Sequence, residues 1–242
     1  MNRAFKIYPE FYPELFWIKS WIKFPAIRMP MDTRIRKIKT NSYDYPEVLR
    51  RRNAQGLYPH IWAIGDLEIL DNPLLGFFCS VKCPGEVILR VYDLARNLRD
   101  AGVAVIGGFH SPLEKDCLDL LMRGTQPVVI SPARSIENMR IPSAWKEPLT
   151  QGRLLILSPF ESKHRRLTAT LAEQRNRFVA YVADQVLVAY AALGGKTQRF
   201  CSEIAAQSKP MYTLDLKEND YMTQLGFYGI NVNNVAETLA TT

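Results

Sequence analysis

The chain has 242 residues, of which 47% are hydrophobic and 23% are charged, with 13 Gly, 15 Pro and only 4 Cys. That length can bury a substantial core in one large domain. The composition excludes collagen, a disordered tail protein and a disulfide-stapled secreted module. A net charge of +7 suggests a polyanionic partner without requiring one, so the placement of the charge matters.

The excess of positive charge lies in the N-terminal part of the chain. Residues 1–60 hold 12 Lys and Arg against 5 Asp and Glu, whereas residues 61–242 hold 19 of each. We therefore divide the chain into a basic N-terminal extension, 1–42, and a domain over 43–242. The extension is expected to pack on the domain or on a second subunit, with binding to a membrane surface or disorder as alternatives. Translation could also begin at Met29 or Met31.

Two short segments of the extension suggest secondary structure. Glu14–Phe24 fits an amphipathic helix and Thr33–Lys39 fits a strand. Charged residues interrupt the hydrophobic stretch before it reaches signal-peptide or membrane-spanning length. The 4 Cys and 3 His have no zinc-binding spacing, and scattered thiols are typical of a reduced protein. We expect a cytoplasmic protein with no membrane contact, no metal and no cofactor.

Short apolar runs alternate with stretches of helical length through the domain. Six runs predict strands buried on both faces: Leu75–Cys79, Val103–Ile106, Pro127–Ser131, Leu154–Leu157, Gln185–Ala189 and Met211–Leu214. The intervening segments predict helices over 85–101, 112–123, 134–149, 164–183 and 196–208, with closing helical pieces at 219–226 and 233–240. This order predicts an α/β, Rossmann-like fold, a mostly parallel sheet with helices on both faces.

Ligands of such sheets bind beyond the carboxyl ends of the strands, so the strand-to-helix turns are candidate sites. Three turns combine glycines, hydroxyls and cations at expected helix starts, a combination suited to phosphate. None has the spacing of a dinucleotide fingerprint or of a P-loop. The candidate phosphate-binding residues are Ser80 and Lys82 in the first turn, Gly107, Gly108, Phe109, His110 and Ser111 in the second, and Gly194, Gly195, Lys196 and Thr197 in the third.

The second turn also predicts how its helix begins. Ser111 fits an N-cap with Pro112 at the first helical position and Glu114 two residues later, which is a capping box. A capping role accounts for Ser111 and Glu114 completely. No triad or carboxylate pair stands out, so Glu114 is the one weak catalytic candidate.

A basic cluster occupies residues 163–177, with five basic residues against one acid. On a helical wheel Leu167, Leu171 and Phe178 share one face, and Arg175 lies at its edge. An arginine beside a buried stripe requires a carboxylate or a bound anion. Charge runs on helices are usually solvated faces, and the excess of five basic residues over one acid adds an anion site as the alternative.

Several of these elements together resemble the DprA/Smf DNA-processing family. The segment Tyr45–Leu49 is similar to the family's YP-x-x-L element, and the glycine turn at 107–114 falls where the family has its V-S-G turn. Arg175-Asn176-Arg177 and the strand after it are similar to the R-N-R signature. Gly194–Thr197 falls at the family's S-G-S-x-x-T turn. The similar elements keep their order over about residues 43–214.

The resemblance implies an extended Rossmann fold, a homodimer, binding of single-stranded DNA in a basic pocket, and transfer of that DNA to a recombinase during uptake or recombination. It adds Arg175, Asn176 and Arg177 to the DNA-contacting candidates. The chain departs from the family where His110–Glu114 replaces an A-R-G-I-D segment and where Lys82 replaces an arginine.

Two other functions remain open. The same crevice could serve a nucleotide sensor or a hydrolase that cleaves nucleoside monophosphates, as in the related lysine decarboxylase-like enzymes. Phe200 occupies the position of their signature glutamate, which disfavours hydrolysis. A scaffold that binds a partner through residues 1–42 is the third possibility. Phe109, close to the crevice, is a candidate for stacking on bases.

Overall fold

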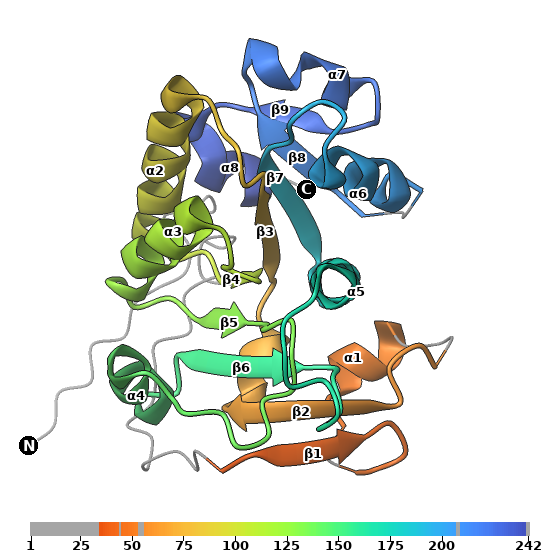
Figure 1. Cartoon of the computed structure of the whole chain (residues 1–242). Coiled ribbons are helices and arrows are strands. Elements are labelled where there is room, and N and C mark those ends of the chain that lie inside the picture. Colours follow the sequence, from red (N-terminus) through yellow and green to blue (C-terminus); the bar gives the residue numbers. More distant parts are fainter. Residues whose placement is uncertain (1–33, 44, 53–55, 207–208, 241–242) are drawn as a thin grey trace, which may run out of the picture.

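The computed structural model describes residues 34–43, 45–52, 56–206 and 209–240. The helix expected over Glu14–Phe24 lies outside these residues. Within them, nine strands form one sheet in the order β1-β2-β6-β5-β4-β3-β7-β8-β9 (Figure 1). The strands are β1 (Arg36–Lys39), β2 (His60–Gly65), β3 (Leu75–Cys79), β4 (Val105–Gly107), β5 (Val128–Ile130), β6 (Leu154–Ser158), β7 (Gln185–Tyr190), β8 (Met211–Leu214) and β9 (Tyr228–Ile230).

The sheet is parallel from β6 to β9, and β2 pairs antiparallel with both β1 and β6. All six predicted strands form, and β1 confirms the strand expected over Thr33–Lys39. The mostly parallel Rossmann-like fold is therefore confirmed. Because β1 belongs to the sheet, the folded domain begins before residue 43, so the extension that we drew to residue 42 reaches too far into the domain.

Two strands were not predicted. The segment of β2 is as apolar as a central strand, but it pairs antiparallel with β6. An antiparallel strand needs no helical crossover, so the alternation of strands and helices did not reveal it. The strand β9 has only three residues, and two of them are exposed. It begins after the helical piece expected at 219–226, which forms only as the short helix Asp220–Thr223.

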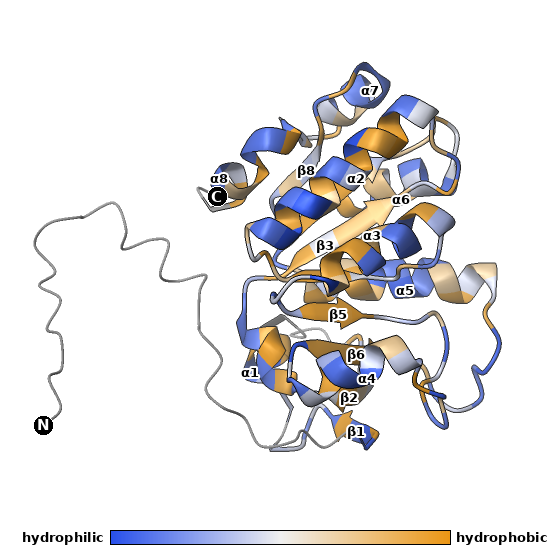
Figure 2. Cartoon of the chain, turned by 90° about the vertical axis from the view of Figure 1, so that its left-hand side faces the viewer, coloured by the Kyte–Doolittle hydropathy of each residue, from blue (hydrophilic) through white to orange (hydrophobic). Residues whose placement is uncertain are grey.

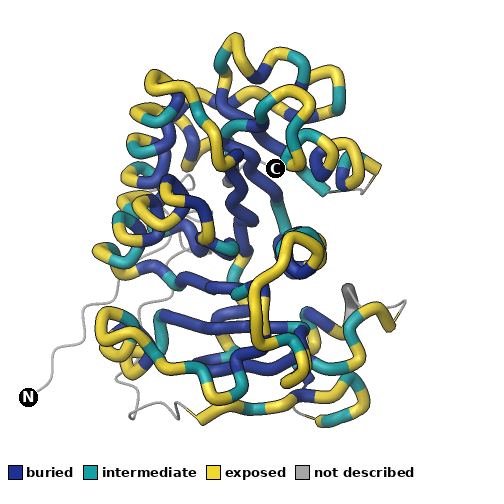
Figure 3. The backbone as a smooth tube through the Cα atoms, viewed as in Figure 1, coloured by how far each residue is buried: buried dark blue, intermediate teal, exposed yellow. Residues whose placement is uncertain are grey.

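Helices cover both faces of the sheet (Figure 1). They are α1 (Glu47–Arg52), α2 (Gly85–Asp100), α3 (Pro112–Met122), α4 (Ser143–Thr150), α5 (Ala169–Val182), α6 (Lys196–Ile204), α7 (Asp220–Thr223) and α8 (Val235–Ala240). Side chains from α2, α3, α4 and α8 share one hydrophobic cluster, and side chains from α1, α5, α6 and α7 share the other. Figure 2 shows the hydrophobic strand β3 behind the amphipathic α2, and Figure 3 shows the buried strands between exposed helix surfaces.

Two of the long predicted helices begin later than expected. The helix predicted over 134–149 exists only as α4, because Pro132 and Pro142 bound an irregular loop before it. The helix predicted over 164–183 begins at Ala169, where the hydroxyl of Thr168 accepts a hydrogen bond from the Leu171 amide. Leu167 consequently lies before the helix and is 45% exposed, not on its buried face.

The strand order places two turns at the point where the winding of the sheet reverses. The chain proceeds from β3 to β4 on one side, and β7 later pairs with β3 on the other side. The turns after β3 and β7 therefore leave the sheet side by side. In open α/β sheets, the crevice at such a reversal is the usual ligand site.

Candidate nucleic-acid interface

Hydrogen bonds join the three predicted turns at the carboxyl edge of the sheet. The amide of Ala192, after β7, donates to the buried hydroxyl of Ser80, after β3, at 2.9 Å. The amide of Cys79 donates to a carboxylate oxygen of Glu114, on α3, at 3.3 Å. The structure thus brings all three turns together, as the fold predicted, but Ser80 serves to connect two of them.

Glu114 forms the predicted capping box. Its Oε2 accepts from the amides of His110 and Ser111 at 3.0 and 3.1 Å, while the Ser111 hydroxyl accepts from the Glu114 amide at 3.2 Å. With Cys79, three backbone amides donate to this buried carboxylate. These bonds fix the start of α3 and assign Glu114 a structural role.

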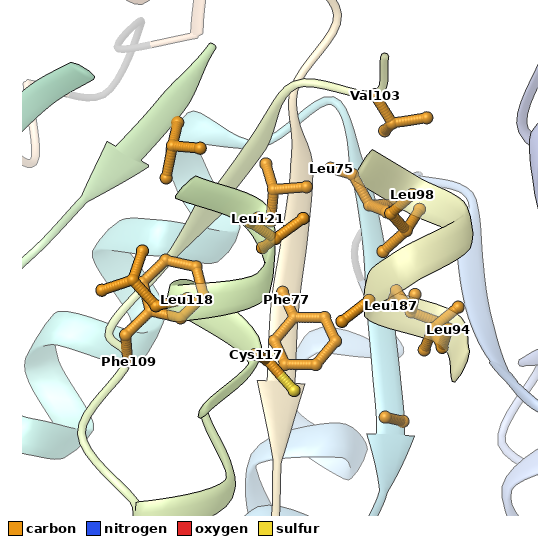
Figure 4. Close-up of a cluster of buried hydrophobic side chains, with 14 of the residues drawn as sticks. Leu75, Phe77, Leu94, Leu98, Val103, Phe109, Cys117, Leu118, Leu121 and Leu187 are labelled. Atoms are coloured by element: carbon orange, nitrogen blue, oxygen red, sulfur yellow. The ribbon is translucent and has the colours of Figure 1, made fainter. Parts of the chain in front are cut away.

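Phe109 turns its ring into the core. Its φ of 44° lies in the left-handed region, which a bulky residue rarely adopts. The ring is 5% exposed and stacks on Phe77, with 6.3 Å between ring centroids (Figure 4). Base stacking on Phe109 was therefore a wrong expectation: the turn uses this side chain as an anchor, and only its position beside the crevice was correct.

Arg175 is the most unusual charged residue of the edge. Its side chain extends from α5 and is 5% exposed. Nε donates to Asn176 Oδ1 at 2.8 Å and Nη1 donates to the Ser131 carbonyl at 3.2 Å. Among the described residues it forms no ion pair, and burial lowers its pKa. A buried guanidinium with only neutral hydrogen-bond partners is poised for an anion.

Gly108 makes room for that guanidinium. A β-carbon at this position would overlap Nη1 and Cζ of Arg175. The guanidinium of Arg175 therefore lies directly against the backbone of the glycine turn. This contact explains why the second turn contains a glycine at 108, a feature that the capping box leaves unexplained.

A first cleft of about 390 Å³ opens between α3, α5 and α6. Two of the four Lys and Arg side chains that line it are paired with carboxylates: Lys196 Nζ lies 3.0 Å from Glu173, and Arg177 Nη2 lies 2.9 Å from Glu203. The ion pair lowers the pKa of Glu173, so this carboxylate stays ionised. The predicted residues lining the cleft are His110, Ser111, Glu114, Arg175, Asn176, Arg177, Lys196 and Thr197; sequence reasoning missed Glu173, Arg199 and Glu203.

The start of α6 belongs to the rim of this cleft. Gly195 is the N-cap and offers no side chain to the first helical amides. Gly194 has a φ of +72°, the left-handed conformation that suits glycine, and its amide donates to the side chain of Gln198 at 2.5 Å. The free amides of a helix start with a cation at its first position favour an anion.

A second cleft, of about 260 Å³, lies on the other side of Arg175, between α3 and the loop before α4. Among the described residues lining it are Arg175, Lys115, Arg134 and Arg140, and no carboxylate. The half-buried ring of Trp145 lines it too. Sequence reasoning missed this cleft because it assigned 134–149 to a helix. The loop between Pro132 and Pro142 contains few acidic residues, and this was the sequence signal that could have indicated the cleft.

The remaining candidates lie apart from both clefts. Lys82 is exposed and lines neither cleft. Gly107 is buried inside β4, where its role is close packing against the Phe109 ring. The basic residues 163–166 border a separate open depression. Within the described ranges no cluster of His, Cys, Asp or Glu could hold a metal ion, and no helix is long and apolar enough to cross a bilayer.

Fold and site define a Rossmann-like α/β protein with two clefts at the carboxyl edge of its sheet, both lined by basic side chains. The chain belongs to a family of DNA-processing proteins: the model of DNA recombination-mediator protein A matches residues 36–226. The predicted family is thereby confirmed. No curated protein matches the chain in sequence.

Solved structures agree on the fold. DNA processing protein A of Streptococcus pneumoniae superposes with a TM-score of 0.68 at 15% identity, over 85% of this chain and 75% of that one. The Helicobacter pylori protein, which is described as binding single-stranded DNA in a unique mode, gives 0.68 at 18% identity over 88% and 99%. A molybdenum cofactor binding protein of Rippkaea orientalis gives 0.50 at 13% identity over 70% and 96%.

Proposed function

We propose that this protein binds single-stranded DNA along the carboxyl edge of its sheet, as part of DNA processing. The observation that carries the proposal is Arg175, a buried guanidinium without an ion-pair partner among the described residues, which lines both clefts. The carboxylate that acts on it electrostatically is that of Glu114, which forms no ion pair with it, and a phosphate between the clefts would supply a direct partner. The single-stranded DNA binding described for the similar Helicobacter pylori protein supports the same ligand.

The geometry favours a strand over a free nucleotide. Both clefts contain Arg175 and His110, so they adjoin at these two residues. Cations continue on each side, with Lys196 and Arg199 lining the first cleft and Arg134 and Arg140 lining the second. A chain of phosphates uses cations spread in this way, whereas one nucleotide would need only one cleft.

Bases require a surface for stacking, and Trp145 supplies one in the second cleft. Its ring is partly exposed, unlike the ring of Phe109. Stacking on an aromatic side chain contributes roughly 1–3 kcal/mol per base and tolerates every base. The proposed affinity is therefore driven by phosphates, assisted by one aromatic contact, and independent of sequence.

The structure offers less to a hydrolase. Three backbone amides occupy the Glu114 carboxylate, and Phe200 is buried against Phe78 with ring centroids 4.8 Å apart. Neither position presents a free carboxylate to a glycosidic bond. We extend the binding proposal to a homodimer in the cytoplasm that passes bound DNA to a recombinase during uptake or recombination.

Fluorescence anisotropy with labelled oligo-dT tests the proposal. We expect binding that weakens linearly in a plot of log affinity against log salt, with a slope of roughly −0.7 for each phosphate neutralised on a single strand. A duplex of equal length and a nucleoside monophosphate serve as competitors, and both should compete poorly. Absence of binding at low salt, or equal competition by the monophosphate, would overturn the proposal.

A further inference from the structure

Two cysteines lie almost in contact in the turn after β3. The sequence Cys79-Ser80-Val81-Lys82-Cys83 leaves the strand and bends back, and the two sulfur atoms are 3.7 Å apart. Both thiols are free. Neither the fold nor DNA binding requires sulfur at these positions, because the core contacts of Cys79 would suit any small apolar side chain.

The two thiols differ in access and acidity. Cys79 is buried, whereas Cys83 is half-buried and reachable from solvent. The hydrogen bond with Cys79 lowers the pKa of Cys83, and the same bond together with burial raises the pKa of Cys79. Burial raises the pKa of Cys117 and that of Cys201 to about 12. An accessible thiol with a lowered pKa beside a second thiol is the arrangement of redox-sensing cysteines.

We propose that Cys79 and Cys83 form a peroxide-responsive pair that closes reversibly to a disulfide. The Cys83 thiolate attacks one oxygen of hydrogen peroxide, and the O–O bond breaks. The departing hydroxide takes up a proton to become water, which leaves Cys83 as a sulfenic acid. The Cys79 sulfur then attacks the Cys83 sulfur, the S–O bond breaks, and the oxygen leaves as water with the Cys79 proton. Two thiols are oxidised and one peroxide is reduced to two waters.

The turn has the freedom to close the bond. A disulfide requires the sulfur atoms to approach from 3.7 Å to about 2.05 Å. Cys79 is held in β3 and Ser80 is tethered to the turn after β7. Val81 and Lys82 are exposed, so we expect Cys83 to move toward Cys79 when the disulfide forms. A dithiol of this kind in a reduced compartment would form its disulfide only transiently.

Formation of the disulfide would change the shape of the first cleft. Cys79 and Val81 line that cleft, and the Cys79 amide donates to Glu114 at the start of α3. The pair also lies at the reversal of the sheet winding, where the turns after β3 and β7 meet. Oxidation would therefore reshape one wall of the cleft, a regulation that goes beyond the proposed DNA binding.

The test is disulfide mapping of the full-length protein. The reduced chain is treated with one equivalent of hydrogen peroxide, and the remaining thiols are alkylated after denaturation. We expect two of the four cysteines to escape alkylation, and dithiothreitol to restore them. Trypsin cuts after Lys82, between the two cysteines, so the disulfide should join peptide 53–82 to peptide 83–90. Reduction should separate these peptides.

Two variants complete the design. Cys83→Ser should yield no such joined peptides, while Cys201→Ala, which removes a buried cysteine outside this turn, should oxidise like the wild type. Over-oxidation of Cys83 without a link to Cys79 would overturn the proposal, as would a disulfide to Cys117 or between two chains. The readout needs no DNA, so failure of the DNA proposal would leave this result standing.

Discussion

The two clefts that share Arg175 differ in how their cations are neutralised. In the first, Lys196 and Arg177 are each paired with a glutamate. In the second, no carboxylate lies among the described residues that line it, and Lys115, Arg134 and Arg140 form no ion pair within the described part of the chain. A phosphate entering the first cleft competes with carboxylates, whereas one entering the second does not.

This difference implies a division of labour along a bound strand. Ion pairs between exposed side chains contribute little to stability, so the glutamates of the first cleft act mainly on the ligand by reducing its attraction. The cations of the second cleft have no carboxylate among the described lining residues to reduce their attraction for the ligand. We therefore expect most of the affinity from Arg175 and the second cleft, and a tunable contribution from the first.

The largest expected effect comes from removing the residue common to both clefts. Arg175→Ala should weaken binding of oligo-dT by roughly 10- to 100-fold, because hydrogen bonds to charged groups contribute about 1.5–3 kcal/mol. Fluorescence anisotropy measures the loss. A drop confined to one salt concentration, or binding equal to the wild type, would contradict the role of Arg175 as the shared anion site.

Gly108→Ala is the matched test of how Arg175 is positioned. The added methyl group would displace the guanidinium without removing its charge. We expect a loss of binding close to that of Arg175→Ala, with thermal unfolding reporting any accompanying loss of stability. Retained affinity in a folded Gly108→Ala protein would show that the position of the guanidinium, as opposed to its charge, is unimportant.

The same contrast shows what sequence alone could provide. Six strands of the parallel sheet, the capping box of Ser111 and Glu114, and the position of Arg175 at the edge of its helix face follow from periodicity and spacing, which are local. The inward turn of Phe109 depends on its contact with Phe77, and the pairing of Lys196 depends on Glu173 one element away. Such contacts join residues distant in sequence, so neither local pattern nor net charge reveals them.

The next largest effect compares the contributions of the two clefts to DNA affinity. Removing both Arg134 and Arg140 should weaken binding several-fold and reduce the magnitude of the salt slope by roughly 1.4, since each phosphate contact on a single strand contributes roughly 0.7. Lys196→Ala should weaken binding less, because it removes a cation already paired with Glu173. Anisotropy at several salt concentrations gives both slopes. A larger loss for Lys196→Ala than for the double variant would reverse the comparison.

The smallest effect has the opposite sign. Glu173→Gln removes the carboxylate that pairs with Lys196 but keeps the shape of the side chain, so the freed ammonium gains a phosphate contact. We expect affinity for oligo-dT to rise about two- to threefold at low salt, and the gain to disappear at high salt, because exposed charges are screened. Glu161→Gln, whose carboxylate pairs with Lys163 outside both clefts, is the control and should leave affinity unchanged. If Glu173→Gln instead weakened binding, Glu173 would serve to hold Lys196 in a productive position, and the paired state of the first cleft would be its binding state.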